Sequence, residues 1–176
     1  PFAPNCDAIA QAHQTIDALF LNTPQFEIDA LNQVLNTRLI LKVETLNPIR
    51  SFKGRGTDYF VRQTQAAAFV CASAGNFGQG MAYACRQQPI PLTVFAAETA
   101  NPLKVDRMRQ LGAEVQLAGA DFDAAKAAGK AYAAEHGMTY VEDGREAAVT
   151  AGAGTIGLEL GQYPEPIHML LVPIGN

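Results

Sequence analysis

Expected strands alternate with segments of helix-forming composition between residues 69 and 141. Residues 69–71 are a short apolar run suited to a buried strand, and further strands are expected at residues 92–96, 113–117 and 138–141. The segments between them favour helices and lie at residues 77–87, 102–111 and 121–136. Strands and helices that alternate at this spacing predict βαβ units, and therefore a twisted parallel sheet.

The residues at the expected helix ends agree with this pattern. Asn101, followed by Pro102, and Asp121 are suited to cap the starts of two helices. Gly112 and Gly137 follow the ends of two helices, where a left-handed backbone conformation is common.

The first third of the chain is less regular. A helix is predicted from residues 4–5 onward, because Ile9, Ile16 and Phe20 recur at helical spacing, and residues 22–24 end it. The apolar run at residues 39–43 predicts a strand. A second helix is expected from Ser51, which can cap it, to about residue 65.

Composition and charge narrow the function classes. The 176 residues, of which 48% are hydrophobic, can bury a sizeable core. A formal net charge of −4 gives no basic surface, so neither nucleic acid nor a membrane is an expected partner. No apolar run approaches membrane-spanning length. The three cysteines, Cys6, Cys71 and Cys85, have no metal-like spacing, so we expect reduced thiols in a cytoplasmic protein and no metal site.

Residues 51–56, with the sequence SFKGRG, carry the first candidate chemistry. The Lys53 amine can form a Schiff base with an aldehyde and, once freed, can act as a base if desolvation or a neighbouring cation favours its neutral form. Arg55 is such a cation. Gly54 and Gly56 permit close approach of a flat ring or another backbone. Taken alone, Lys53 would be read as a solvated helix lysine.

Residues 72–76, with the sequence ASAGN, lie at a predicted strand-to-helix turn. Such a turn offers backbone N–H groups and the positive end of a helix dipole to a carboxylate or phosphate. Without Lys53, an ordinary βα connection would be the better interpretation.

Together the two segments resemble the motifs of fold-type II pyridoxal-phosphate enzymes, most closely the serine/threonine dehydratases (ammonia-lyases), and the resemblance extends from about residue 39 to 172. It implies pyridoxal 5'-phosphate as the cofactor, carried by Lys53. It also implies that Phe52 packs on the pyridine ring and that Asn76 hydrogen-bonds to the ring hydroxyl.

The same resemblance implies a site for a small amino-acid substrate. Ser73, Ala74 and Gly75, with Asn76, match the loop that holds the substrate carboxylate. Gly175 and Asn176 would begin the Gly-rich phosphate cradle, after a strand at residues 168–173.

The implied fold is α/β, with parallel twisted sheets and flanking helices in a two-domain architecture similar to the tryptophan synthase β subunit. Residues 1–65 would begin the large cofactor domain, residues 66–145 would form a small βαβ domain, and residues 146–176 would return to the large domain. We expect the large domain to be incomplete here, the chain to be the N-terminal part of a longer enzyme, and the complete protein to be a dimer.

The implied activity is β-elimination of L-serine, L-threonine or a related 3-hydroxy amino acid to a 2-oxo acid and ammonia. Ala74 stands where related serine racemases carry a serine, and Gly54 stands where the cysteine and threonine synthase branches carry an acidic residue. Both departures disfavour a racemase or β-replacement enzyme, which remains the nearest alternative. Phe77 replaces a histidine common among relatives, so we expect a more apolar entrance to the site.

Two further alternatives remain. One is a non-catalytic fragment or pseudoenzyme. The other is a nicotinamide enzyme, because residues 152–157 (GAGTIG) have the spacing of a dinucleotide-binding loop. No convincing strand precedes this segment and no acidic residue follows about twenty positions on, which disfavours that reading. The segment also resembles the Gly-x-Gly-Thr stretch that opens a large-domain helix in the dehydratase family.

Overall fold

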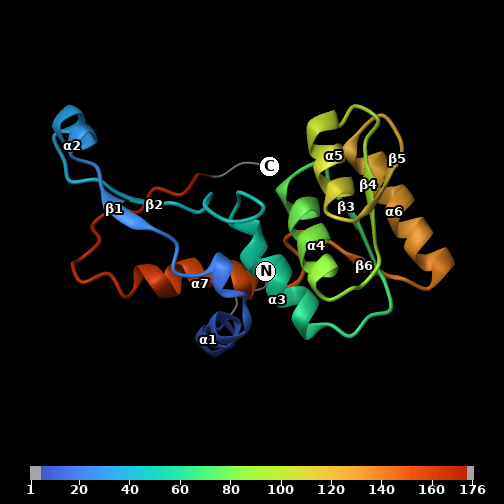
Figure 1. Ribbon diagram of the computed structural model, residues 1–176, viewed down its shortest axis with the longest axis horizontal. Coiled ribbons are helices and arrows are strands. Elements are labelled where there is room, and N and C mark those ends of the chain that lie inside the picture. Colours follow the sequence, from blue (N-terminus) through green and yellow to red (C-terminus); the bar gives the residue numbers. More distant parts are fainter. Residues whose placement is uncertain (1–4, 174–176) are drawn as a thin grey trace.

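The computed structural model describes residues 5–173 and centres on a four-stranded parallel sheet. The sheet has the order β5-β4-β3-β6, with α4 and α5 on one face and α6 on the other (Figure 1). Its strands are β3 (Phe69–Ala72), β4 (Leu92–Ala96), β5 (Glu114–Leu117) and β6 (Thr139–Val141). Its helices are α4 (Asn76–Gln87), α5 (Pro102–Gln110) and α6 (Phe122–His136). The predicted βαβ block is confirmed.

Strand β3 shows why its sequence is continuously apolar. Phe69 and Cys71 belong to the core on the α4 side, while Val70 and Ala72 pack toward α6. A parallel strand covered on both faces needs apolar residues at every position. Cys71 and Cys85 are both buried and free, and burial raises the pKa of the Cys85 thiol to about 12.

The predicted helix ends are also confirmed. The Asn101 side chain accepts a hydrogen bond from the Leu103 N–H at 2.9 Å, and Asp121 accepts one from Ala124 at 2.9 Å. Gly112 (φ +96°) and Gly137 (φ +63°) adopt the left-handed conformation that follows a helix.

The N-terminal region departs from the prediction. Helix α1 (Cys6–Thr15) stops before Ile16, and a short 3₁₀ turn, η1 (Ala18–Phe20), follows. The Asp58 carboxylate accepts the Asp17 N–H at 2.8 Å, and Asp17 in turn caps η1, so the chain leaves the helix there. Ile16 and Phe20 are both buried, which is why their spacing resembles that of one continuous helix.

Residues 25–42 form an arm that the sequence pattern did not reveal in full. Strands β1 (Gln25–Glu27) and β2 (Ile40–Lys42) pair antiparallel, and the segment that connects them contains α2 (Asp29–Leu35) at the tip of the arm (Figure 1). The predicted strand at residues 39–43 is therefore confirmed, but its partner was missed.

Near the other end, α7 (Ala147–Leu160) contains the whole GAGTIG segment. The glycine pattern therefore lies inside a helix that begins several residues before it, at Ala147. The predicted strand at residues 168–173 is wrong, since these residues belong to no strand or helix within the described range. Met169 and Leu171 are 77% and 76% exposed, so no neighbouring strand covers them there.

Gly175 and Asn176 lie outside the described residues, so the predicted start of the cradle is not part of the fold described here. The predicted domain boundaries at 65 and 145 also stay predictions. None of the helices between residues 5 and 173 combines the length and apolar character needed to cross a membrane.

Helix α3 (Lys53–Gln63) lies between α7 and α4 (Figure 1). A Cβ atom on Gly152 of α7 would lie 2.6 Å from the Arg55 carbonyl oxygen, and one on Gly56 would meet the Val149 carbonyl. The two helices therefore cross at backbone contact, and the glycines at the crossing are required by packing.

The guanidinium of Arg55 holds this crossing together from inside. Arg55 is fully buried and bonds to Glu44 through Nε at 2.8 Å and to Glu159 of α7 through Nη1 at 2.6 Å. Lys42 lies 2.6 Å from the second oxygen of Glu159. Burial alone would raise the pKa of Glu159, but hydrogen bonds from Arg55, Lys42 and the Asn22 N–H lower it to about 2.

We expect Arg55→Met to lower the free energy of unfolding by about 3–5 kcal/mol, because it leaves Glu44 and Glu159 without their shared cation. Urea denaturation would measure this loss. Arg109→Met is the matched control, because Arg109 makes only an exposed pair with Asp106 at 3.5 Å, and we expect it to cost less than about 1 kcal/mol. Equal losses in the two variants would contradict the structural role of Arg55.

We expect the stability to depend on pH through Glu159. Its folded-state pKa is depressed, so its contribution is present above about pH 4.5 and is lost as the pH falls toward 2. The loss is on the order of 3 kcal/mol at most. Urea denaturation of the wild-type and Glu159→Gln proteins from pH 7 to pH 3 would test this. The free-energy difference between the two should shrink as the pH falls, and a constant difference would refute it.

Candidate active site

The strand order locates a topological switch point between β3 and β6. From β3 the chain adds β4 and then β5 on one side, and returns to place β6 on the other side of β3. In open parallel sheets, ligands bind beyond the carboxyl ends of the strands at such a point. Here those ends lead into residues 73–76 after β3 and residues 142–143 after β6.

The turn before α3 places Lys53 at the same edge of the sheet. The Asn47 side chain accepts the N–H groups of Ile49 and Ser51 at 3.2 and 3.3 Å. It also donates to the carbonyls of Glu44 and Ser51 at 2.9 and 3.1 Å. The N-cap of α3 is Phe52 and not Ser51 as predicted, although the Ser51 hydroxyl accepts the Lys53 N–H at 3.3 Å; Lys53 is the first residue of the helix.

The amine of Lys53 lies between an aromatic ring and a carboxylate. Its Nζ atom is 2.7 and 2.9 Å from the two carboxylate oxygens of Asp143, and 5.2 Å from the centroid of the Phe52 ring. The Lys53 side chain is 27% exposed and Phe52 is 39% exposed. The amine therefore lies at the switch point, within reach of solvent.

The candidate cation Arg55 does not lie beside Lys53. Arg55, two residues along the helix, points to the opposite side, into the buried network with Glu44 and Glu159. The charged neighbour of Lys53 is Asp143, which the sequence analysis did not single out. An acidic residue immediately after a predicted parallel strand was the signal that could have found it.

The loop after β3 is organised by Ser73, which is buried. Its hydroxyl oxygen accepts the N–H groups of Gly75 and Gly78 at 3.2 and 2.9 Å. A hydroxyl has two acceptor lone pairs and one donor, so the Ser73 O–H can still donate to an anion. Asn76 and Phe77 begin α4, where backbone N–H groups have no partner within the helix.

The other predicted loop residues lie in the open part of this turn. Ala74 and Gly75 are half-buried, and the side chain of Asn76 is exposed. A Cβ added to Gly75 would meet no atom within 4 Å, so the space in front of it is open. Phe77 is 4% exposed and belongs to the core, so the expectation that it lines an apolar entrance is wrong.

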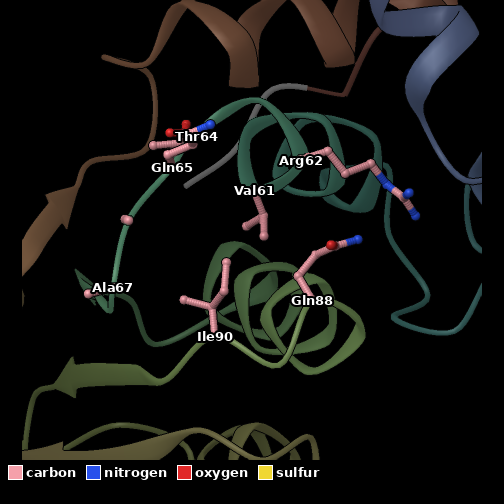
Figure 2. A pocket seen from close by; sticks show the side chains of 8 residues that line it. Val61, Arg62, Thr64, Gln65, Ala67, Gln88 and Ile90 are labelled. Atoms are coloured by element: carbon pink, nitrogen blue, oxygen red, sulfur yellow. The ribbon is translucent and has the colours of Figure 1, made fainter.

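One of two hollows in the described structure borders this region. A hollow of about 330 Å³ lies beside the turn that leads into Lys53, and three cations that the sequence analysis missed contribute to its wall, namely Arg50, Lys104 and Arg107. A larger hollow, of about 560 Å³, lies where β3 and β4 begin, and Figure 2 shows Val61 and Ile90 pointing toward each other across it. Because this is the edge opposite Lys53, size alone does not mark the site.

No group of three or more His, Cys, Asp or Glu residues suited to a metal ion occurs between residues 5 and 173. The chemistry brought together at the switch point is thus one primary amine, one carboxylate, one aromatic ring and a loop of N–H and O–H donors. Lys53, Phe52, Ser73, Ala74, Gly75 and Asn76 all lie on the two segments that meet at this edge, and Gly175 lies outside the described residues.

Comparisons with known proteins agree with this arrangement. The chain is 38% identical over 149 residues to the L-threonine ammonia-lyase of Geobacter sulfurreducens, covering 82% of this chain and 37% of that enzyme. Its fold matches the processed form of threonine deaminase isoform 2 from Solanum lycopersicum with a TM-score of 0.82 at 26% identity, covering 96% of this chain and 49% of that one. It matches a pyridoxal 5'-phosphate-dependent aspartate racemase with a TM-score of 0.85 at 29% identity, covering 94% and 53%.

The chain spans 31% to 42% of the length of three curated threonine dehydratase and ammonia-lyase relatives. The family model described as "Pyridoxal-phosphate dependent enzyme" matches residues 16–176. The predicted family resemblance and α/β architecture are therefore confirmed. The chain belongs to the family of pyridoxal-phosphate dependent enzymes.

Proposed function

We propose that this chain forms the lysine-bearing part of an enzyme that converts L-serine, L-threonine or a related 3-hydroxy amino acid to a 2-oxo acid and ammonia. The observation that carries the proposal is the convergence of the Lys53 amine and the Ser73–Asn76 loop at the switch point of the sheet. The 38% identity to a threonine ammonia-lyase supports the reaction class.

The residues present at this edge fit pyridoxal phosphate. Lys53 supplies a partly exposed primary amine, the group that condenses with an aldehyde. Phe52 presents a partly exposed aromatic face next to that amine, suited to a flat heterocycle. The open space in front of Gly75 leaves room for a ligand between the two segments.

When bound, the cofactor supplies an electron sink for the negative charge that forms at the substrate Cα atom. Lys53 would hold the cofactor and, as a free amine, would take the Cα proton. Asn76 would hydrogen-bond to the cofactor's ring hydroxyl. The Ser73 hydroxyl and the N–H groups at the start of α4 bind the substrate carboxylate and so orient the Cα–H bond, where correct placement contributes most to the rate.

A racemase remains the second candidate, since an aspartate racemase shares the fold at 29% identity. Ala74 offers no hydroxyl that could act on the face opposite Lys53, which favours elimination. Product analysis separates the two, because elimination releases a 2-oxo acid and racemisation releases a D-amino acid. A β-replacement enzyme would need a second substrate that replaces the hydroxyl.

We also propose the domain division at residues 65 and 145, with the sheet as the small domain. Support comes from α3 and α7, which pack on each other through the Arg55 network and so group both ends of the chain together. We further propose that a phosphate cradle begins at Gly175. We also propose that the full-length enzyme is a cytoplasmic dimer.

Lys53→Ala should abolish the visible absorbance of the lysine-bound cofactor and the elimination activity of the full-length polypeptide, while the far-UV spectrum stays unchanged. Lys104→Ala, which removes an exposed lysine of α5, should leave both signals in place. Borohydride reduction followed by peptide mass analysis identifies the modified lysine. Cofactor trapped on Lys42 or Lys104 instead would overturn the assignment.

Asn76→Ala should shift the absorbance maximum of the bound cofactor and lower kcat. Because the Asn76 side chain is exposed, the free energy of unfolding should change by no more than about 0.5 kcal/mol. The variant and the wild-type protein are compared by absorbance spectra, steady-state kinetics and urea denaturation. A variant with a wild-type spectrum and rate would remove Asn76 from the site.

A further inference from the structure

Asp143 is placed at the site by the fold and not by either motif. Asp143 follows β6 and lies ninety positions from Lys53 in the sequence. Its two carboxylate oxygens accept hydrogen bonds from the Lys53 Nζ atom at 2.7 and 2.9 Å. The pair joins the first residue of α3 to the carboxyl end of β6. It is therefore a contact between the helix that bears the amine and the sheet that bears the loop.

The neighbouring carboxylate, Glu142, pairs with other cations and not with Lys53 among the described residues. Glu142 accepts Lys126 at 2.5 Å, Lys130 at 2.9 Å and Arg145 at 3.2 Å. Hydrogen bonds from Lys126 and Lys130 lower the pKa of Glu142 to about 2. Three cations thus compensate Glu142, whereas Asp143 has Lys53 as its ion-pair partner among residues 5–173.

We propose that Asp143 is the positioning residue of Lys53: whenever the amine is not covalently engaged, the two carboxylate oxygens hold it at the switch point, and this contact limits its reaction with aldehydes. This rests on the proposed role of Lys53 in carrying the cofactor. The same contact holds Nζ beside the Phe52 ring, so the amine and the aromatic face stay together.

The chemistry of the reacting amine predicts how the reaction rate of Lys53 changes when the Asp143 carboxylate is removed. To bond to an aldehyde carbon, the ammonium must first release a proton to solvent, because only the neutral amine has the required lone pair. The carbonyl oxygen then leaves as water. The contact with both oxygens of Asp143 has to open before the amine can approach the carbonyl carbon, so removing the carboxylate should speed the reaction. Since the pair is partly exposed, the expected increase in rate is about two- to fivefold.

Competitive acylation tests this without any activity measurement. The cofactor-free protein is treated at pH 7 with a trace of acetic anhydride, and the modification of Lys53 is measured by peptide mass relative to the exposed Lys104. Asp143→Asn should raise this ratio about two- to fivefold. Glu142→Gln, at the adjacent carboxylate, should leave it unchanged, and Asp143→Glu should keep it near the wild-type value.

An unchanged ratio in Asp143→Asn, or an equal rise in Glu142→Gln, would overturn the inference. General unfolding is recognised separately, because it would also expose the buried Lys42 to the reagent. If Asp143→Asn fails to fold, the wild-type protein is acylated in about 1 M salt instead. Screening of the Lys53–Asp143 pair by salt should then raise the modification of Lys53 relative to Lys104. A ratio that does not respond to salt would then count against the pair.

A second readout uses pyridoxal phosphate itself as the aldehyde probe. Borohydride trapping at Lys53 should be faster in Asp143→Asn than in the wild-type protein, and unaltered in Glu142→Gln. Trapping at a different lysine would contradict the proposed function while the acylation result still stands. Faster acylation with slower trapping at Lys53 would overturn the claim that the pair limits aldehyde capture.

Discussion

A buried arginine with two carboxylates is the constraint on which the rest of this structure depends. A guanidinium without contact to water is tolerated only when its donors are matched, and Arg55 is matched by Glu44 and Glu159, which lie 11 and 104 positions away. The three groups can meet only if β2, α3 and α7 adopt one relative placement. That placement also sets the start of α3, and so determines where the chain can present Lys53.

The site then follows from two independent features. The Arg55 side chain points inward from α3, and Lys53, two residues earlier on the helix, points away from it toward the sheet. The strand order separately brings the ends of β3 and β6 together at one edge. The amine contacts Asp143 after β6, and the Ser73–Asn76 loop follows the adjacent strand β3, so the helix register and the sheet topology together place both at one edge.

The sequence predicted the parts of the fold that are encoded locally. Strands β3 and β4 are buried on both faces, and β3 is accordingly apolar at every position. Asn101, Asp121 and Gly137 mark helix ends through short-range hydrogen bonds and backbone conformation. Features that depend on distant partners were missed. Residues 168–173 have strand composition, but pairing needs a neighbour that a pattern cannot supply. Arg55 was read as a neighbour of Lys53 because its true partner, Glu159, is far along the chain. Asp143 was overlooked because an acidic residue after a strand is also common in ordinary turns.

The cations Arg55 and Lys53 differ in the kind of contact that they make. Hydrogen bonds and charges from Glu159 and Glu44 outweigh burial and raise the pKa of Arg55, whose guanidinium stays charged under all ordinary conditions. Such a cation suits a permanent internal contact. A lysine ammonium is a compact charge on a flexible stem, and the Lys53–Asp143 pair is partly exposed to solvent, where such a contact can open. If the two residue types were exchanged, the helix crossing would contain a lysine, which can be neutralised. The switch point would then carry an arginine, which is unreactive. The position of each cation is therefore dictated by whether its contact has to persist or to break.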